Sequence, residues 1–79
     1  MTTYQVTNFR IGENTGVISI GNTLNFKTWS EARSYISRTT NHNCYQTNTN
    51  EWRTPWLPKC VDGKERICSM YRIDEFKAE

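Results

Sequence analysis

The sequence lacks both a long apolar run and a cluster of like charges. No stretch is long and apolar enough to cross a membrane, and the first residues contain no apolar signal-peptide core. Ten Lys and Arg residues balance eight Asp and Glu residues, and the two signs are interspersed. This pattern excludes an acidic nucleic-acid mimic and a polybasic membrane anchor. We therefore expect a cytoplasmic protein that makes no contact with a membrane.

Cysteine and histidine are also scarce. The three cysteines, Cys44, Cys60 and Cys68, are odd in number and irregularly spaced, whereas a secreted disulfide scaffold usually has an even, denser set. We expect reduced and mostly buried thiols. A Cys60–Cys68 disulfide across a three-residue hairpin loop stays open as an alternative. A zinc site formed by these cysteines and His42 is a weaker alternative, because the spacing lacks the close ligand pairs of structural zinc sites. The sequence thus predicts no metal or other cofactor.

Recognisable signatures of catalysis are missing. The sole histidine, His42, lies among polar residues, and the chain contains no phosphate loop and no nucleophile elbow. A chain of 79 residues is also expected to have difficulty enclosing a ligand pocket of ~300 Å³. We interpret the protein as non-enzymatic.

The size and hydrophobic content predict one small domain over residues 1–79. A chain this short buries only about 60% of the surface that its unfolded form exposes. Hydrophobic residues make up 35% of the sequence and aromatic residues 13%, so the core should depend on a few large rings. We expect residues 74–79 to form a charged, flexible C-terminal tail.

The clearest local pattern predicts a helix over residues 29–38. Thr28 and Glu31 have the spacing of a capping box, in which each residue satisfies a backbone N–H group at the helix start. Apolar residues then recur on one helical face: Trp29, Ala32, Tyr35 and Ile36. Poor helix formers follow Arg38 and predict the helix end.

The segment before this helix predicts a strand meander. A strand is expected over residues 4–11, with apolar residues of both parities. Either a bulge near Asn8 resets the alternation, or both sheet faces are partly covered. A short strand over 17–20 and a two-residue turn at 21–22 lead into residues 24–26.

The segment after the helix predicts further strands. A short strand is possible over 44–47, and strands over 59–61 and 66–73 are joined by a hairpin turn at 62–63. The resulting β-β-α-β-β order predicts an α+β fold. The simplest arrangement is a small antiparallel sheet with the helix packed on one face.

The segment EWRTPWLPKC, residues 51–60, is the strongest candidate for a protein contact. Its two prolines predict a loop. Trp and Arg are common at interface hot spots, and we assign partner binding to Trp52, Arg53, Trp56 and Lys59. Because large hydrophobic residues are few, one ring should pack in the core. We expect Trp56 to be the buried ring, and Trp52 with Arg53 to face outward.

Two other interaction surfaces are possible. Arg66, Arg72 and Tyr71 combine charge with an aromatic ring, as single-stranded nucleic-acid-binding proteins do, although no basic stripe is present. Self-association through an exposed strand edge would instead give a homodimer. The sequence leaves the choice between monomer and homodimer open.

In size, strand–helix order and its Asn- and Thr-rich polar surface, the chain resembles small phage-encoded accessory proteins, including anti-CRISPR proteins. The resemblance is one of architecture and carries no particular residue over. It implies a viral protein without enzymatic activity that inhibits by covering a surface of a host defence complex. The sequence thus favours a protein-binding module or inhibitor, with weak nucleic-acid binding as the alternative.

Overall fold

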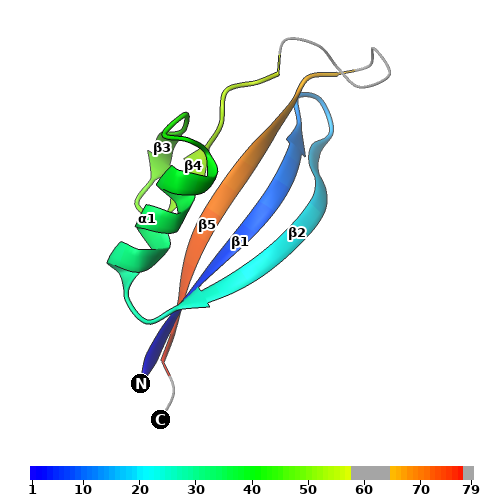
Figure 1. Ribbon diagram of the computed structural model, residues 1–79. Coiled ribbons are helices and arrows are strands. Elements are labelled where there is room, and N and C mark those ends of the chain that lie inside the picture. The colour runs from blue at the N-terminus through cyan, green and yellow to red at the C-terminus, as the bar shows by residue number, and fades with distance from the viewer. Residues whose placement is uncertain (58–64, 78–79) are drawn as a thin grey trace.

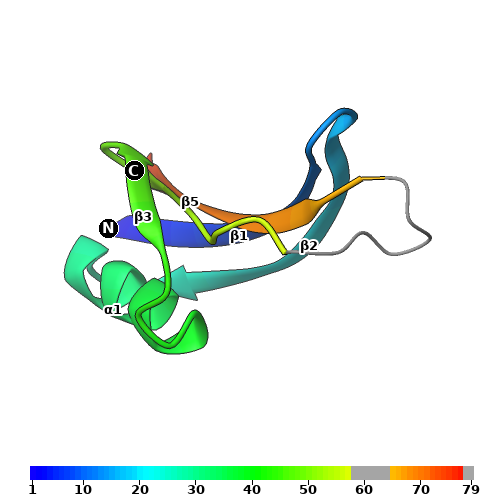
Figure 2. The ribbon, with the colours of Figure 1, turned by 90° about the horizontal axis from the view of Figure 1, so that it is seen from above.

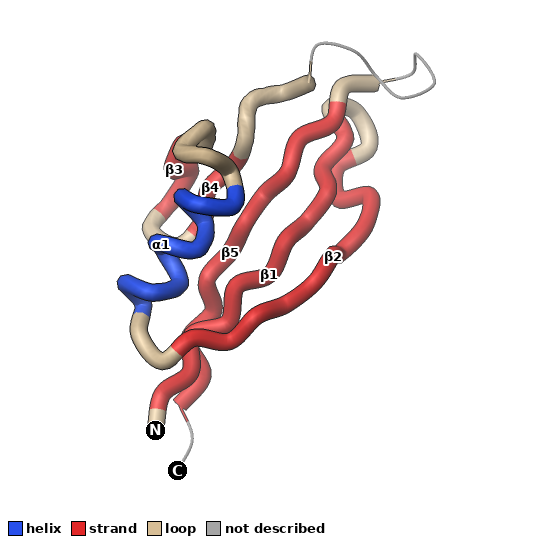
Figure 3. The backbone as a smooth tube through the Cα atoms, viewed as in Figure 1, coloured by secondary structure: helices blue, strands red, loops and turns tan. Residues whose placement is uncertain are grey.

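Five strands and one helix make up the described part of the computed structural model, which covers residues 1–57 and 65–77 (Figures 1 and 3). In chain order the elements are β1 (Thr2–Gly12), β2 (Gly16–Phe26), α1 (Trp29–Thr39), β3 (Tyr45–Asn48), β4 (Glu51–Arg53) and β5 (Ile67–Lys77). This confirms the α+β class and the predicted order of strands around one helix. The strand predicted over 59–61 and the turn at 62–63 lie outside the described residues.

The strands form one antiparallel sheet in the order β2-β1-β5-β4-β3. Its centre is the β1–β5 pair, which runs without a register break from Thr2 opposite Lys77 to Gly12 opposite Ile67. The prediction of a flexible tail is therefore wrong for residues 74–77, because these residues continue β5 and pair with β1. The molecule is elongated, with extents of 47 × 23 × 19 Å.

Two β-bulges interrupt the pairing of β1 with β2. At the first, Asn8 alone lies opposite Gly21 and Asn22; at the second, Ile18 is the additional residue. The turn predicted at 21–22 is therefore wrong, because β2 passes through these residues as one strand. A bulge inserts one residue into a strand and increases its local twist. Figure 2 shows β2 curving along its length.

The helix begins where its capping sequence predicts. The backbone N–H of Glu31 donates to the Thr28 hydroxyl oxygen at 3.1 Å, and that hydroxyl donates to the Glu31 carboxylate at 3.2 Å. The helix extends one residue beyond the predicted end, to Thr39. Of the predicted apolar face, Ala32 and Ile36 are fully buried and Tyr35 is partly buried. Trp29 is 39% exposed, so its expected burial is wrong.

Two apolar clusters form the core. The first contains Val6, Ala32, Ile36, Trp52, Tyr71 and Ile73, and the second contains Phe9, Ile11, Cys68 and Met70. Val6 lies opposite Ile73, whereas Phe9 lies opposite Met70. Because positions 6 and 9 have opposite parity, the two clusters lie on opposite faces of β1 and β5. Both faces are therefore partly covered, and the bulges that the strand pattern suggested belong to β2.

Two ionisable groups in these clusters have raised pKa values, and we therefore predict that the protein is less stable at alkaline pH. Burial raises the pKa of Tyr71, and Tyr35 and Cys44 raise it further. Burial also raises the pKa of Cys68, an effect that the charge of Arg53 partly offsets. Above their ordinary pKa values the unfolded chain loses these protons before the folded chain does. The stability is therefore fully present at neutral pH and falls as the pH rises through the ordinary and then the raised pKa values.

We expect urea unfolding to show a lower free energy at pH 11 than at pH 8. Tyr71→Phe should make this decline smaller, because phenylalanine has no proton to lose. Tyr45→Phe is the matched control, since Tyr45 is exposed on β3. An unfolding free energy that is constant over this range would contradict the prediction.

Candidate interaction edge

The structure corrects the predicted roles of the two loop tryptophans: Trp52, expected to face outward, is the more deeply buried, and Trp56, expected to be buried, is only partly so. Trp52 is only 2% exposed and belongs to the first core cluster, whereas Trp56 is half-buried against the second. The guanidinium of Arg33 lies 4.8 Å from the centre of the Trp52 ring, and the Trp29 ring lies 6.0 Å away. The prediction that Trp52 faces outward is wrong, because Pro55 interrupts strand pairing only beyond residue 53. Glu51–Arg53 can therefore pair as a strand, with Trp52 opposite Tyr71.

The rest of the predicted contact segment is divided between different environments. Arg53 is half-buried in β4, with its guanidinium 3.9 Å from the Glu51 carboxylate. Lys59 lies outside the described residues. Within the described part of the segment, Leu57 is the most exposed large apolar side chain, at 54%. Trp52 and Arg53 therefore do not provide the exposed Trp–Arg contact that the sequence suggested.

The proposed nucleic-acid residues also face in different directions. Tyr71 is buried in the first cluster, so its predicted role in stacking a base is wrong. Neighbouring strand residues point to opposite faces. The Arg72 guanidinium lies 4.9 Å from the centre of the Phe9 ring on the other face, and its Nε is 3.0 Å from the Asp74 carboxylate. Arg66 is paired with Glu13.

The candidate metal ligands are likewise separated. His42 is exposed, Cys44 packs against the first cluster and Cys68 belongs to the second. Cys60, and with it the Cys60–Cys68 disulfide alternative, falls outside the described residues. Cys44 and Cys68 are free thiols. Within residues 1–57 and 65–77, no three His, Cys, Asp or Glu side chains converge as a metal site would require.

The sequence reasoning did not locate the most exposed apolar element, which is β2. This strand is one edge of the sheet, and every residue of Gly16–Phe26 except Phe26 is exposed. Its large exposed apolar residues are Val17, Ile18, Ile20 and Leu24, and Ile20 is the most exposed of these at 66%. We call the outer side of Gly16–Phe26 the β2 edge.

The β2 edge has little of the protection that edge strands usually carry. Natural edges are shortened, charged, interrupted by proline or bulged, because unpaired main-chain groups attract further strands. β2 has bulges but no charged residue and no proline. The opposite edge, β3, is only four residues long, and the Thr47 hydroxyl donates back to the Glu51 carboxylate at 3.0 Å. The β2 edge is therefore the more open place for an extended chain to add main-chain hydrogen bonds.

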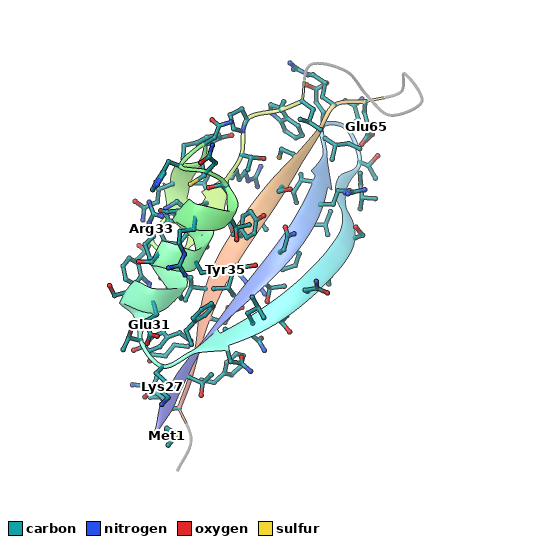
Figure 4. The ribbon with its side chains drawn as sticks, viewed as in Figure 1. Met1, Lys27, Glu31, Arg33, Tyr35 and Glu65 are labelled. Carbon is teal, nitrogen blue, oxygen red and sulfur yellow. The ribbon has the colours of Figure 1, made fainter. Side chains whose placement is uncertain are left out.

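The two ends of the β2 edge differ in charge. Near its start, Glu65 accepts a hydrogen bond from the Thr15 hydroxyl at 2.7 Å, and Glu13 pairs with Arg66. At its end, Lys27 makes no ion pair within the described residues. Figure 4 shows Glu65 and Lys27 at opposite ends of the molecule. The acidic groups near the start are thus engaged within the chain, because Arg66 offsets the charge of Glu13 and Oε1 of Glu65 is buried.

An open cavity of about 620 Å³ adjoins the Lys27 end. Its largest apolar lining residues are Tyr4, Phe26 and Trp29, and the lining contains no histidine, cysteine or carboxylate side chain. This hollow lies open between β1 and the start of α1, so the expectation that so short a chain has difficulty enclosing a pocket of ~300 Å³ stays a prediction. Its lining suits an apolar side chain of a bound segment better than acid–base chemistry.

Comparison with protein-family models, curated proteins and solved structures finds no match to this chain. Among the described residues, no helix is long and apolar enough to cross a membrane. The assignment of a binding edge therefore rests on the exposure, pairing and charge of β2 itself.

Proposed function

We propose that the protein is a non-enzymatic protein-binding module that adds an extended segment of its partner to the β2 edge. The observation that carries this proposal is an eleven-residue edge strand with exposed apolar side chains and no charge. In strand addition, main-chain hydrogen bonds supply affinity and alternate side chains supply specificity. In this proposal α1 covers one face of the inner strands, where Ala32 and Ile36 cluster with Val6 and Ile73, and leaves β2 accessible.

The chemistry of the edge indicates the kind of segment it binds. Val17, Ile18 and Ile20 favour an uncharged segment rich in β-branched residues, because such side chains pack well across neighbouring strands. The cavity beside Lys27 can accept one large apolar side chain of the same segment. A partner held in this way has part of its surface covered. We therefore also propose inhibition by occlusion, the mode of action of the phage anti-defence proteins that the chain resembles.

Selection from a library of random peptides displayed on phage tests this proposal. We expect the selected peptides to alternate Val, Ile or Thr with polar residues, and to bind the wild-type protein in the micromolar range. Ile20→Lys should weaken their binding about tenfold or more, because it places a charge among the apolar contacts of an otherwise uncharged edge.

Two substitutions of the same type serve as controls. Tyr45→Lys changes the other sheet edge, and Leu57→Lys changes the loop that the sequence favoured; both residues are about half exposed. We expect both variants to bind the selected peptides as the wild-type protein does. If Leu57→Lys abolishes binding while Ile20→Lys leaves it unchanged, the loop is the contact and the β2 edge is not. If no peptide is selected, strand addition is also rejected.

A further inference from the structure

The cavity of about 620 Å³ at the start of α1 has the size and the lining of a small-molecule site. We call it the Lys27 cavity. We propose that it binds a small organic anion with a flat apolar body and one carboxylate group. The apolar body lies against the rings of Tyr4, Phe26 and Trp29, and the carboxylate pairs with the ammonium of Lys27. This site is distinct from the β2 edge and does not depend on the function proposed for that edge.

The pairing of β1 with β2 explains why the cavity is there. The last residue of β2, Phe26, lies opposite Tyr4, so Thr2 and Thr3 have no β2 residue opposite them. The chain leaves the sheet at this point and turns into α1. The cavity is the space between the start of β1 and this turn.

The rings that line the Lys27 cavity are held in place by the protein itself. The indole Nε1 of Trp29 donates to the side-chain oxygen of Asn50 at 2.8 Å, and the Trp29 ring lies 6.0 Å from the ring of Trp52. Tyr4 and Phe26 both pack against the first core cluster. Because folding has already fixed these rings, a ligand loses little free energy in ordering them.

The same rings keep apolar surface that no side chain covers. Trp29 is 39% exposed, although it belongs to the apolar face of α1, and Tyr4 and Phe26 are only partly buried. A flat apolar body that lies against them removes this surface from water, which favours binding.

The charge of the lining selects an anion. Among the described residues that line the cavity, Lys27 alone has a charged side chain, and no ion pair to it is formed by residues 1–57 or 65–77. Figure 4 shows Lys27 at the same end of the molecule as Met1. The Thr2 hydroxyl points to the same side of β1 as Tyr4 and adds a hydrogen-bond donor.

The carboxylates at neighbouring positions are engaged elsewhere. Glu75 lies opposite Tyr4 on β5, and its carboxylate is 3.6 Å from the ammonium of Lys77. The Glu31 carboxylate accepts a hydrogen bond from the Thr28 hydroxyl at 3.2 Å, and Glu31 lines a different hollow. Neither glutamate lines the Lys27 cavity, so a ligand carboxylate meets a cation there and no like charge.

Titration with naphthoate, followed by two-dimensional NMR of the full chain, tests this proposal. We expect saturable shifts of the amide signals of residues 25–29 and of the Trp29 indole N–H, with a dissociation constant of about 1 mM or lower. Naphthamide has the same rings and no charge, so it should bind about fivefold more weakly. If these signals do not saturate up to about 10 mM naphthoate, or if the two compounds bind equally, the proposal is overturned.

Two substitutions that each remove one positive charge locate the anion. Lys27→Gln should weaken naphthoate binding about fivefold and leave naphthamide binding unchanged, so that the two compounds become equal. Arg10→Gln is the matched control, because Arg10 is exposed at the other end of β1, and it should preserve the preference for naphthoate. If Arg10→Gln removes the preference and Lys27→Gln does not, the anion lies elsewhere and the proposal is wrong.

Two further substitutions test the apolar part of the site. Trp29→Ala should weaken both compounds about tenfold, whereas Leu57→Ala, which removes another exposed apolar side chain, should weaken neither. Circular dichroism establishes that each variant is folded. Ile20→Lys should bind naphthoate as the wild-type protein does, because Ile20 does not line the cavity. Failure of this site is therefore distinguishable from failure of peptide binding at the β2 edge. Binding that survives Trp29→Ala unchanged would contradict the proposed site.

Discussion

Replacement of Trp52 by alanine is expected to lower the free energy of unfolding by about 3–5 kcal/mol. The Trp52 side chain is almost fully enclosed by the first core cluster, and its ring contacts the Arg33 guanidinium and lies near Trp29. A domain of 79 residues has a total stability of roughly 4–12 kcal/mol, so this substitution removes a large share of it. Thermal unfolding followed by circular dichroism should show a midpoint lower by about 15 °C or more.

Trp56→Ala is the matched control for this prediction. Trp56 is half-buried and packs at the margin of the second cluster, so we expect a loss of about 1–2 kcal/mol. Trp52→Phe retains a ring in the first cluster and gives a measurable intermediate loss if Trp52→Ala does not fold. If Trp56→Ala is the more damaging change, Trp56 is the principal core residue and the burial assigned here to Trp52 is wrong.

Replacement of Ile11 by alanine should cost about 2–5 kcal/mol, because the second cluster is a true core on the sheet face opposite the first. Ile11 is only 5% exposed and clusters with Phe9, Cys68 and Met70. Truncation leaves a cavity among these side chains that the two long central strands cannot easily close. Urea unfolding at neutral pH measures the loss as a lower midpoint with an unchanged slope.

Ile18→Ala makes the same chemical change at an exposed site. Ile18 is 45% exposed on β2, so we expect its loss to cost less than about 1 kcal/mol. Equal losses for Ile11→Ala and Ile18→Ala would mean that the second cluster contributes no more than a surface position does. The protein would then have one core rather than two.

The helix was predictable because its signals are local. Thr28 and Glu31 define its start within four residues, and two of the four positions in the predicted apolar period, Ala32 and Ile36, are buried. The central strands were predictable for a similar reason, since runs of β-branched and aromatic residues indicate strands. Their ends were not predictable: Asp74 to Lys77 look like a charged tail until they pair with the start of β1.

The environment of Trp52 could not be predicted from its neighbours in sequence. The prolines that follow it indicate a loop, but Trp52 is fixed by pairing with Tyr71, which lies far along the chain. The Gly21-Asn22 sequence was misleading in a different way, because the same two residues suit a hairpin turn and a β-bulge. In both cases long-range pairing decides the structure.

The sequence around β2 could not predict that it is an edge strand, because the order of strands in the sheet determines which strand is an edge. One signal was nevertheless present in the sequence. Residues 14–26 form a long uncharged stretch that includes Val17, Ile18 and Ile20. Such a stretch is typical of a strand inside a sheet or of an edge that binds another chain, and the exposure of β2 is the reason we propose the second.

Amide hydrogen exchange with and without a selected peptide tests the central claim, that the β2 edge binds an extended chain. At low micromolar protein concentration, we predict that the peptide slows exchange most in Gly16–Phe26, because the amides that point away from β1 acquire new hydrogen-bond partners. β3 and the segment around Leu57 should be unaffected. Slower exchange around Leu57 with no change in β2 would contradict the claim.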